Sequence, residues 1–81
     1  MAKKARVFVT LKRGVLDPQG SAVNRALHAM GYAEVSDVRL GKVIEVTLDE
    51  SVPEAQERAR LDEMCRKLLA NTVIEDYRIE L

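Results

Sequence analysis

The chain has 81 residues, of which 47% are hydrophobic and 32% charged, and its 13 lysines and arginines balance 13 aspartates and glutamates. Chains of this size build one small core, so we expect a single domain over residues 1–81 that gains stability by forming a homo-oligomer. The single cysteine excludes an internal disulfide and suits a reducing compartment. The sequence has no apolar run of membrane-spanning length and no signal-peptide core, and we therefore expect a cytoplasmic protein.

The charges are unevenly distributed along the chain. Residues 1–42 contain eight lysines and arginines and three acidic residues, whereas residues 43–81 contain five and ten. Two outcomes remain open: the charges cancel in a fold that interleaves the two halves, or they form two faces of opposite sign that favour assembly.

The first part of the chain predicts a strand followed by an amphipathic helix. Apolar and polar residues alternate over 5–12, and the only phenylalanine, Phe8, lies on the face opposite the regular apolar residues. Asp17 and Pro18 match the N-cap and first position of a helix, and Gly31 matches its end. Apolar residues recur between them at spacings of three and four: Ala22, Val23, Ala26, Leu27 and Met30. We expect this helix to lie across a sheet and cover it.

The middle of the chain predicts a hairpin. A weak alternating pattern over 32–40 indicates a second strand, and a clearer one over 43–48 indicates a third. Gly41 and Lys42, between them, are short enough for a tight turn in which the glycine adopts a positive φ.

The last part of the chain predicts a second helix and a final strand. Ser51 and Glu54 match a capping box, and the helix extends from there to about Ala70. A break at Asn71-Thr72 precedes a strand over 73–81.

The order β-α-β-β-α-β predicts a ferredoxin-like α+β sandwich, with a four-stranded antiparallel sheet and two helices on one face. The strands over 5–12 and 43–48 are the most apolar and suit central positions. The more charged strands over 32–40 and 73–81 suit the edges.

Two helices leave the other face of such a sheet uncovered. Phe8, Val35 and Val43 point toward that face. We therefore predict that these three residues serve self-association, with a second chain on this face or along an edge.

The residues do not predict a catalytic or metal site. His28 lies opposite the apolar stripe of its helix, and no carboxylate, serine or cysteine is spaced to act with it, so we interpret it as a surface residue. Cys65 lies inside the apolar stripe of the second helix and is interpreted as a packing thiol. Gly14 and Gly20 flank a helix start but lack the spacing of a phosphate-binding loop. We expect neither catalytic residues nor a metal cluster.

An RNA-binding sheet is also excluded, since such sheets stack bases on several aromatic residues and carry a basic face. The chain has one phenylalanine, two tyrosines and no net charge. The basic tip 39–42 is interpreted as solvent-exposed, or as a docking point for a partner or an anionic ligand.

Four segments taken together resemble a known family: GVLDPQG, ALHAMGY, VRLGKVIEV and CRKLLANTVIEDY. They are similar to the PurS-type small subunit of phosphoribosylformylglycinamidine (FGAM) synthase, the glutamine-dependent ligase of purine synthesis. The chain departs from the family at Thr72, where a proline usually follows the asparagine.

The resemblance implies a homo-oligomer, a dimer or tetramer, that bridges two enzymes and helps to transfer ammonia. One is a large synthetase subunit that holds ATP and formylglycinamide ribonucleotide, and the other is a glutaminase subunit. It implies that this subunit binds no cofactor, while the complex uses ATP and Mg. It also implies a partner-contact surface made of Gly14, Val15, Leu16, Asp17, Pro18, Gly20, Arg39, Gly41, Lys42 and, more weakly, Asn71.

Three alternatives remain open. The glycines and Pro18 of this set would also be expected if they only shape a loop and a cap. A regulatory module that binds an amino acid or nucleotide at a dimer interface shares the predicted fold. An acylphosphatase-type enzyme ranks last, because the stretch at Arg13 and Gly14 does not supply its phosphate-binding loop.

Overall fold

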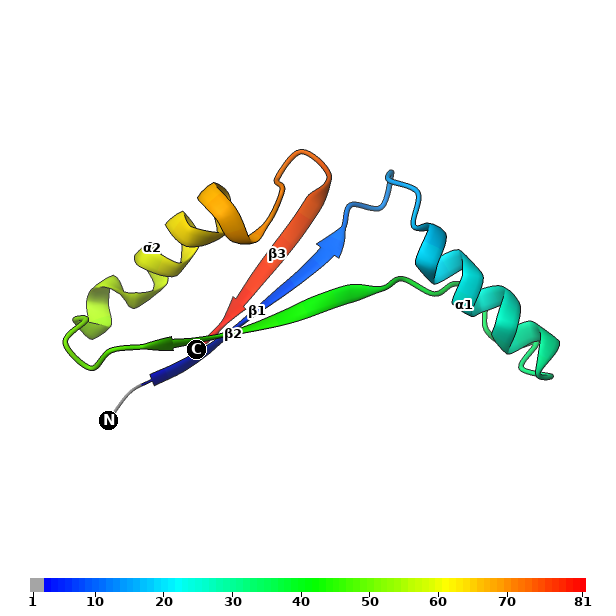
Figure 1. The fold of residues 1–81 in the computed structure, drawn as a ribbon, viewed down its shortest axis with the longest axis horizontal. Helices are drawn as coiled ribbons and strands as arrows, with labels where there is room; N and C mark the ends of the chain where they lie inside the picture. The colour runs from blue at the N-terminus through cyan, green and yellow to red at the C-terminus, as the bar shows by residue number, and fades with distance from the viewer. Residues whose placement is uncertain (1–2) are drawn as a thin grey trace.

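The computed structural model describes residues 3–81, which form a three-stranded sheet, two α-helices and a short π-helix (Figure 1). In chain order, the elements are β1 (Lys3–Leu11), α1 (Pro18–Ala29), β2 (Gly41–Leu48), α2 (Glu54–Met64), the π-helix η1 (Cys65–Leu69) and β3 (Glu75–Glu80). The predicted α+β class is confirmed.

The sheet has the order β2-β1-β3, and both pairs are antiparallel. On the central strand, Val7 lies opposite Ile44 on one side and opposite Ile79 on the other. This is the strand order of a ferredoxin-like sheet that lacks one edge strand. The prediction of four strands is therefore wrong.

The missing strand is the one expected over 32–40. This segment runs back along α1 instead (Figure 1), and the ring nitrogen Nε2 of His28 donates to the carbonyl oxygen of Val35 at 2.6 Å. Its aspartate and, to a lesser degree, its glutamate and alanine are residue types depleted in strands, because they pack poorly on a pleated surface. The weak alternation over 32–40 was therefore outweighed by contacts with the helix.

The tight turn predicted at Gly41 and Lys42 is also wrong. Gly41 begins β2 opposite Thr10, and among the described residues only Gly31 has a positive φ, of 101°. Glycine is needed at 41 for a different reason, since a Cβ there would lie 2.5 Å from the carbonyl oxygen of Val9.

The core lies between one face of the sheet and the α2–η1 segment. It consists of two clusters of buried side chains: Val7, Val9, Cys65 and Ala70 in one, and Ala5, Leu48 and Leu61 in the other. The packing role predicted for Cys65 is confirmed, because this free thiol is fully buried and burial raises its pKa.

The second helix begins later than its predicted cap. Pro53 occupies the N-cap position without a side-chain hydrogen bond, while the Ser51 hydroxyl donates to Asp49 Oδ2 at 2.8 Å. The capping box at Ser51 and Glu54 is therefore wrong. Because the residue before a proline is restricted to extended conformations, Val52 cannot join the first helical turn.

The far end of the second helix lies where it was expected. The helix continues from α2 into η1, where the Ala70 amide donates to the Cys65 carbonyl at 3.0 Å, and the helix ends before Ala70. The last strand begins at Glu75, later than predicted, because the Asn71 carbonyl accepts from the amides of Ile74 and Glu75 in a turn.

Tyr77 on β3 fastens α2 to the sheet. Its hydroxyl donates to Asp62 Oδ1, and Arg66 Nε donates to Asp62 Oδ2 at 2.8 Å. The bond from Tyr77 first, and the bond from Arg66 second, hold the pKa of Asp62 below its ordinary value.

Replacing Tyr77 with phenylalanine is expected to raise the pKa of Asp62 and to destabilise the fold at neutral pH. Because the pKa of Asp62 is lower in the folded than in the unfolded chain, its charge stabilises the fold above about pH 4, and this contribution is lost as pH falls through the folded pKa. Urea unfolding from acid to neutral pH should show a stability difference between parent and variant that closes in acid. An NMR titration measures the pKa of Asp62 in both proteins. Glu63 is the internal control, because its pKa is lowered chiefly by Lys67 and should not change when Tyr77 is replaced. An unchanged titration of Asp62 would contradict the prediction.

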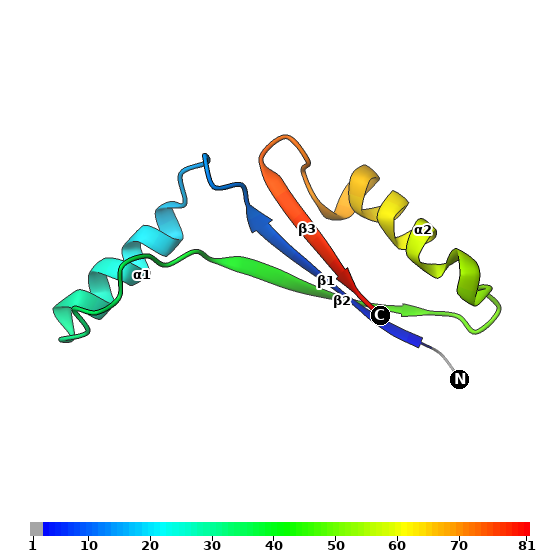
Figure 2. The ribbon, with the colours of Figure 1, turned by 180° about the vertical axis from the view of Figure 1, so that it is seen from behind.

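The first helix does not cover the sheet, and that prediction is wrong. Together with residues 30–40 it forms an arm that projects from the end of the sheet in both views (Figures 1 and 2). The radius of gyration is 16.4 Å, whereas a compact chain of this length has about 12 Å. Asp17 and Pro18 start the helix as predicted, and the expected end at Gly31 is confirmed by its positive φ.

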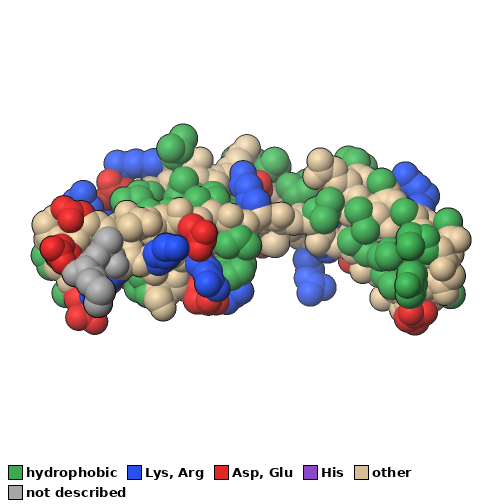
Figure 3. Space-filling model, turned by 60° about the horizontal axis from the view of Figure 1, so that its bottom comes forward, with side chains coloured by type: hydrophobic (Ala, Val, Ile, Leu, Met, Phe, Trp, Pro, Cys, Tyr) green, Lys and Arg blue, Asp and Glu red, His purple; other side chains and the backbone are tan. Residues whose placement is uncertain are grey.

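The arm has no apolar core of its own. Between residues 12 and 47, the buried residues are Asp17 and Gly20, and no large apolar side chain is buried. Val23 is 38% exposed and Met30 is 69% exposed. Hydrophobic side chains accordingly gather at the arm end of the molecule (Figure 3).

Candidate partner-contact site at the root of the arm

The predicted contact residues lie where the arm joins the sheet. Three segments meet there: the loop after β1, the residues just before and at the start of β2, and the turn before β3. The Lys12 amide donates to the Ile74 carbonyl at 2.8 Å, and the Leu40 amide donates to Asp17 Oδ2 at 2.7 Å. The structure thus brings the two main predicted segments together and places the turn of Asn71 beside them.

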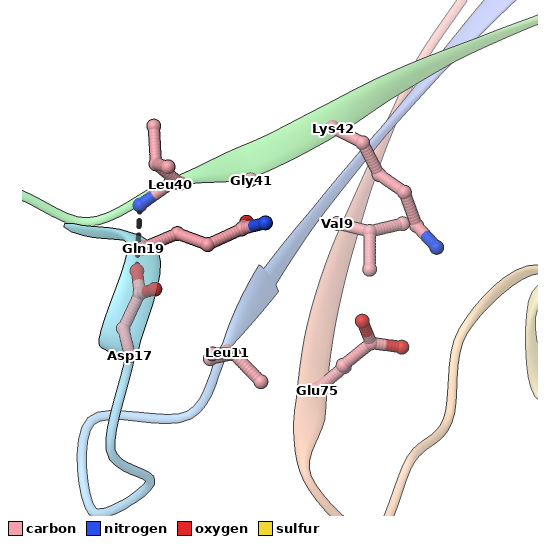
Figure 4. Close-up of a pocket in the computed structure, with 8 residues that line it drawn as sticks. All are labelled: Val9, Leu11, Asp17, Gln19, Leu40, Gly41, Lys42 and Glu75. Atoms are coloured by element: carbon pink, nitrogen blue, oxygen red, sulfur yellow. Dashed lines mark hydrogen bonds between the residues drawn. The ribbon is translucent and has the colours of Figure 1, made fainter. Parts of the chain in front are cut away.

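Asp17 connects two of these segments with one carboxylate. Oδ1 accepts the Gly20 amide at 2.9 Å, which caps α1, while Oδ2 accepts the Leu40 amide (Figure 4). These two bonds, strongest from Gly20, hold the pKa of the buried Asp17 carboxyl below its ordinary value, and the nearby charge of Arg39 adds to them. The predicted N-cap is confirmed.

Arg39 connects the other side of the junction. Its Nη2 donates to the carbonyl oxygens of Leu11 at 3.1 Å, Lys12 at 2.7 Å and Val15 at 3.3 Å. The guanidinium therefore holds the loop that leaves β1 against the segment that returns to β2.

An open cavity of about 260 Å³ lies inside the junction, and the Gln19, Lys42 and Glu75 side chains point into it (Figure 4). Its other lining residues are Val9, Leu11, Asp17, Leu40 and Gly41. A second hollow of about 460 Å³ is lined by Thr10, Leu11, Arg13, Asp37, Arg39 and Asp76. Both hollows are lined by apolar and charged side chains.

The other predicted contact residues differ in exposure. Leu16 is 78% exposed, Gly14 has open space around it, and Val15 is half-buried. Asn71 is joined to the cavity through its amide, which donates to Glu75 Oε1 at 2.7 Å.

Two polar residues of the first cavity, Gln19 and Glu75, were missed by sequence reasoning, as were its apolar lining residues Val9, Leu11 and Leu40. Glu75 is the first residue of β3 and Gln19 is the second of α1. No local pattern distinguishes them, because only the tertiary fold brings these two element ends together.

The residues predicted for self-association are only partly brought together. Phe8 and Val43 lie directly opposite each other on the face of the sheet away from α2, with the Arg78 guanidinium 4.3 Å from the Phe8 ring centroid. Val35 belongs to the arm and not to the sheet. Arg6 lies opposite Glu45 and Glu80 on the same outer face, which is therefore largely charged.

Residues 3–81 show no second candidate site of this kind. His28 is exposed, as predicted. Within this range, no three histidine, cysteine or acidic side chains are grouped so that they could hold a metal ion. None of the helices described is long and apolar enough to cross a bilayer.

The fold and site define a class of small α+β protein, with a three-stranded antiparallel sheet, one packed helical layer and a projecting helical arm. The sequence model of the PurS family, described as "Phosphoribosylformylglycinamidine (FGAM) synthase", matches residues 4–81, and the chain belongs to this family.

Several relatives are similar over nearly their whole length. The PurS subunit of Bacillus subtilis FGAM synthase is 58% identical over 78 residues, which are 96% of this chain and 90% of the relative. The solved structure of B. subtilis PurS has a TM-score of 0.83 and 57% identity, and the match covers 99% of this chain and 96% of that one. A chain in the structure of PurLQS from Thermotoga maritima has a TM-score of 0.86 and 26% identity, with 99% and 96% covered.

The resemblance seen in the sequence is thereby confirmed. The chain is a PurS-type subunit of FGAM synthase, a ligase of purine biosynthesis.

Proposed function

We propose that this subunit bridges the large synthetase subunit and the glutaminase subunit of FGAM synthase and assists the transfer of ammonia between them. The observation that carries the proposal is the projecting arm without a core of its own, in a chain similar to one found in a PurLQS structure. An extended shape with uncovered apolar side chains suits a protein that holds others in register.

The contact surface of this proposal is the root of the arm. Exposed Leu16 and the junction cavity, with Lys42 at its wall, offer one apolar and one polar point of attachment. In this proposal the complex uses ATP and Mg, neither is bound by this subunit, and the complex works in the cytoplasm.

Reconstitution of the enzyme without this subunit tests the bridging role. We expect glutamine-dependent FGAM formation to be abolished, while a high concentration of ammonia still supports the large subunit. In a pull-down, the large synthetase and the glutaminase should both be recovered with this subunit. A glutamine-dependent rate that is normal without the subunit would refute the role.

We further propose that the subunit is a homo-oligomer, a dimer or tetramer, in which the arm is covered by a second copy. Each copy has an unpartnered helix, and its sheet carries half-buried Leu11 and Ile44 where α1 was expected to cover it. Two such copies related by a twofold axis can each cover the other, which closes the assembly.

A double substitution in the apolar stripe tests this assembly. Val23→Gln with Met30→Gln is expected to weaken self-association by more than about tenfold, since burying each side chain contributes roughly 1.5–3 kcal/mol. Arg25→Gln, in the same helix and exposed, is the matched control and should leave the mass unchanged. Analytical ultracentrifugation over a range of concentrations measures both, and equal masses for both variants would contradict the arrangement.

A regulatory ligand-binding module is the second candidate. The junction cavity favours it, because Lys42 and Glu75 present opposite charges to one small space. Calorimetric titration with amino acids and nucleotides distinguishes the two candidates. A regulatory module requires saturable binding of such a ligand, whereas the bridging role does not.

A further inference from the structure

We infer that Asp17 and Arg39 are positioning residues that set the angle between the arm and the sheet, and through it the reach of the subunit between its partners. The second half of this inference rests on the bridging role proposed above.

Apolar packing does not hold the root of the arm. The chain crosses from sheet to arm at residues 12–17 and returns at residues 39–41. In the stretch 12–47, Asp17 and Gly20 are buried, while the buried apolar side chains of the protein begin again at Leu48. The angle is therefore left to polar contacts.

Asp17 fixes the direction of the helix. Its two carboxylate oxygens bind different elements: Oδ1 holds the first turn of α1 through Gly20, and Oδ2 holds the entry to β2 through Leu40. Rotation of α1 against β2 must break one of these bonds, both of which are charge-assisted.

Arg39 fixes the second crossing. It adjoins Leu40 and binds carbonyl oxygens at both ends of the outgoing loop, from Leu11 to Val15. The two side chains thus form a clasp, defined as Asp17 and Arg39 with these bonds, across both connections of the arm.

The arm acts as a lever on this clasp. A helix of the length of α1 spans about 18 Å, so a change of about 10° at the root moves its tip by about 3 Å. Displacements of about 1 Å already reduce rates when reacting groups must be aligned. A loose root would therefore disturb any register between two enzymes that this subunit holds.

The clasp is tested with Asp17→Ala and Arg39→Ala in the full chain, reconstituted with its partners. The matched controls are Glu34→Ala and Arg25→Ala, which remove exposed side chains of the arm that line neither hollow. Spin labels at Ala33→Cys in the arm and Thr47→Cys in β2 report the arm angle, while buried Cys65 stays unlabelled. Labelled chains are diluted with unlabelled copies so that distances within one chain are measured.

The clasp variants are expected to widen the distance distribution about twofold, with the controls unchanged. They should also lower the ratio of glutamine-driven to ammonia-driven synthesis by about tenfold, whereas Arg39→Lys restores part of it because the lysine keeps charged donors. Circular dichroism selects variants that remain folded, and Asp17→Asn is the milder substitute if Asp17→Ala unfolds.

Narrow, unchanged distances in both clasp variants would overturn the inference. Wider distances with an unchanged ratio would overturn the link between arm angle and coupling. Failure of the bridging role itself is distinguishable, because glutamine-driven synthesis by the parent complex would then not depend on the subunit.

Discussion

Replacing Leu61 with alanine is expected to lower the free energy of unfolding by about 2–5 kcal/mol. Leu61 is 0% exposed and packs in α2 with Ala5 and Leu48, where β1 and β2 meet the helix. Truncation of the side chain removes buried methyl groups and leaves a cavity between α2 and the sheet. The hydrogen-bonded strands β1 and β2 cannot move far enough to fill it. A domain of about 80 residues has a stability of roughly 4–12 kcal/mol, so the variant should lose much of it.

Urea unfolding of parent and variant, followed by circular dichroism at one protein concentration, measures this loss. Leu68→Ala is the matched control, because Leu68 belongs to η1, which follows α2 directly, but its side chain is 83% exposed. The control should change stability by less than about 0.5 kcal/mol. Equal losses for the two leucines would show that the core is not where the structure has it.

Replacing Gly20 with alanine is expected to destabilise the protein by about 1–3 kcal/mol, although alanine is the better helix former. A Cβ at this position would lie 2.2 Å from the Val38 carbonyl oxygen and 2.7 Å from Asp17 Oδ2. The backbone of α1 would have to move away from the returning segment, and the bonds of Asp17 would be strained. A loss of stability would show that the close approach of the two backbone segments dominates. A gain would show that the higher helix propensity of alanine dominates.

Gly14→Ala is the control for this substitution. A Cβ at Gly14 would meet no atom within 4 Å, and Gly14 has no positive φ. We expect this variant to be neutral or more stable by about 0.4–1 kcal/mol. Thermal unfolding of both variants under the same conditions compares them, and a stabilised Gly20→Ala would rule out the close approach of α1 to residue 38.

Local signals predicted the element ends well where one short motif determines them. The cap at Asp17, the proline after it and the glycine at 31 act within a single turn of helix, so no distant contact was needed to interpret them. Ser51 was misread because its hydroxyl has a nearer acceptor in Asp49, and a capping motif does not reveal such competition.

The candidate site was only partly accessible to sequence reasoning. The family resemblance implies that Asp17 and Arg39 belong to the site, but their roles in fastening the arm depend on hydrogen bonds to nitrogen and oxygen atoms of the backbone. The sequence gives no local signal for a hydrogen bond between a side chain and a distant backbone atom. Glu75 and Gln19 joined the site for the same reason, since only the folded chain places them at one cavity.

The sequence by itself determined the class of the protein, the three strands that remain and which two segments of the chain are helical, because periodicity and capping are properties of neighbouring residues. The family followed from the resemblance of four segments. Only the tertiary structure decided that residues 32–40 follow α1 and that the helix projects from the sheet. An apolar stripe indicates that one face of a helix is to be buried. It does not specify whether the sheet of the same chain or another chain buries that face. That choice is made by the contacts at residues 17 and 39, where two connections fix the direction of the arm.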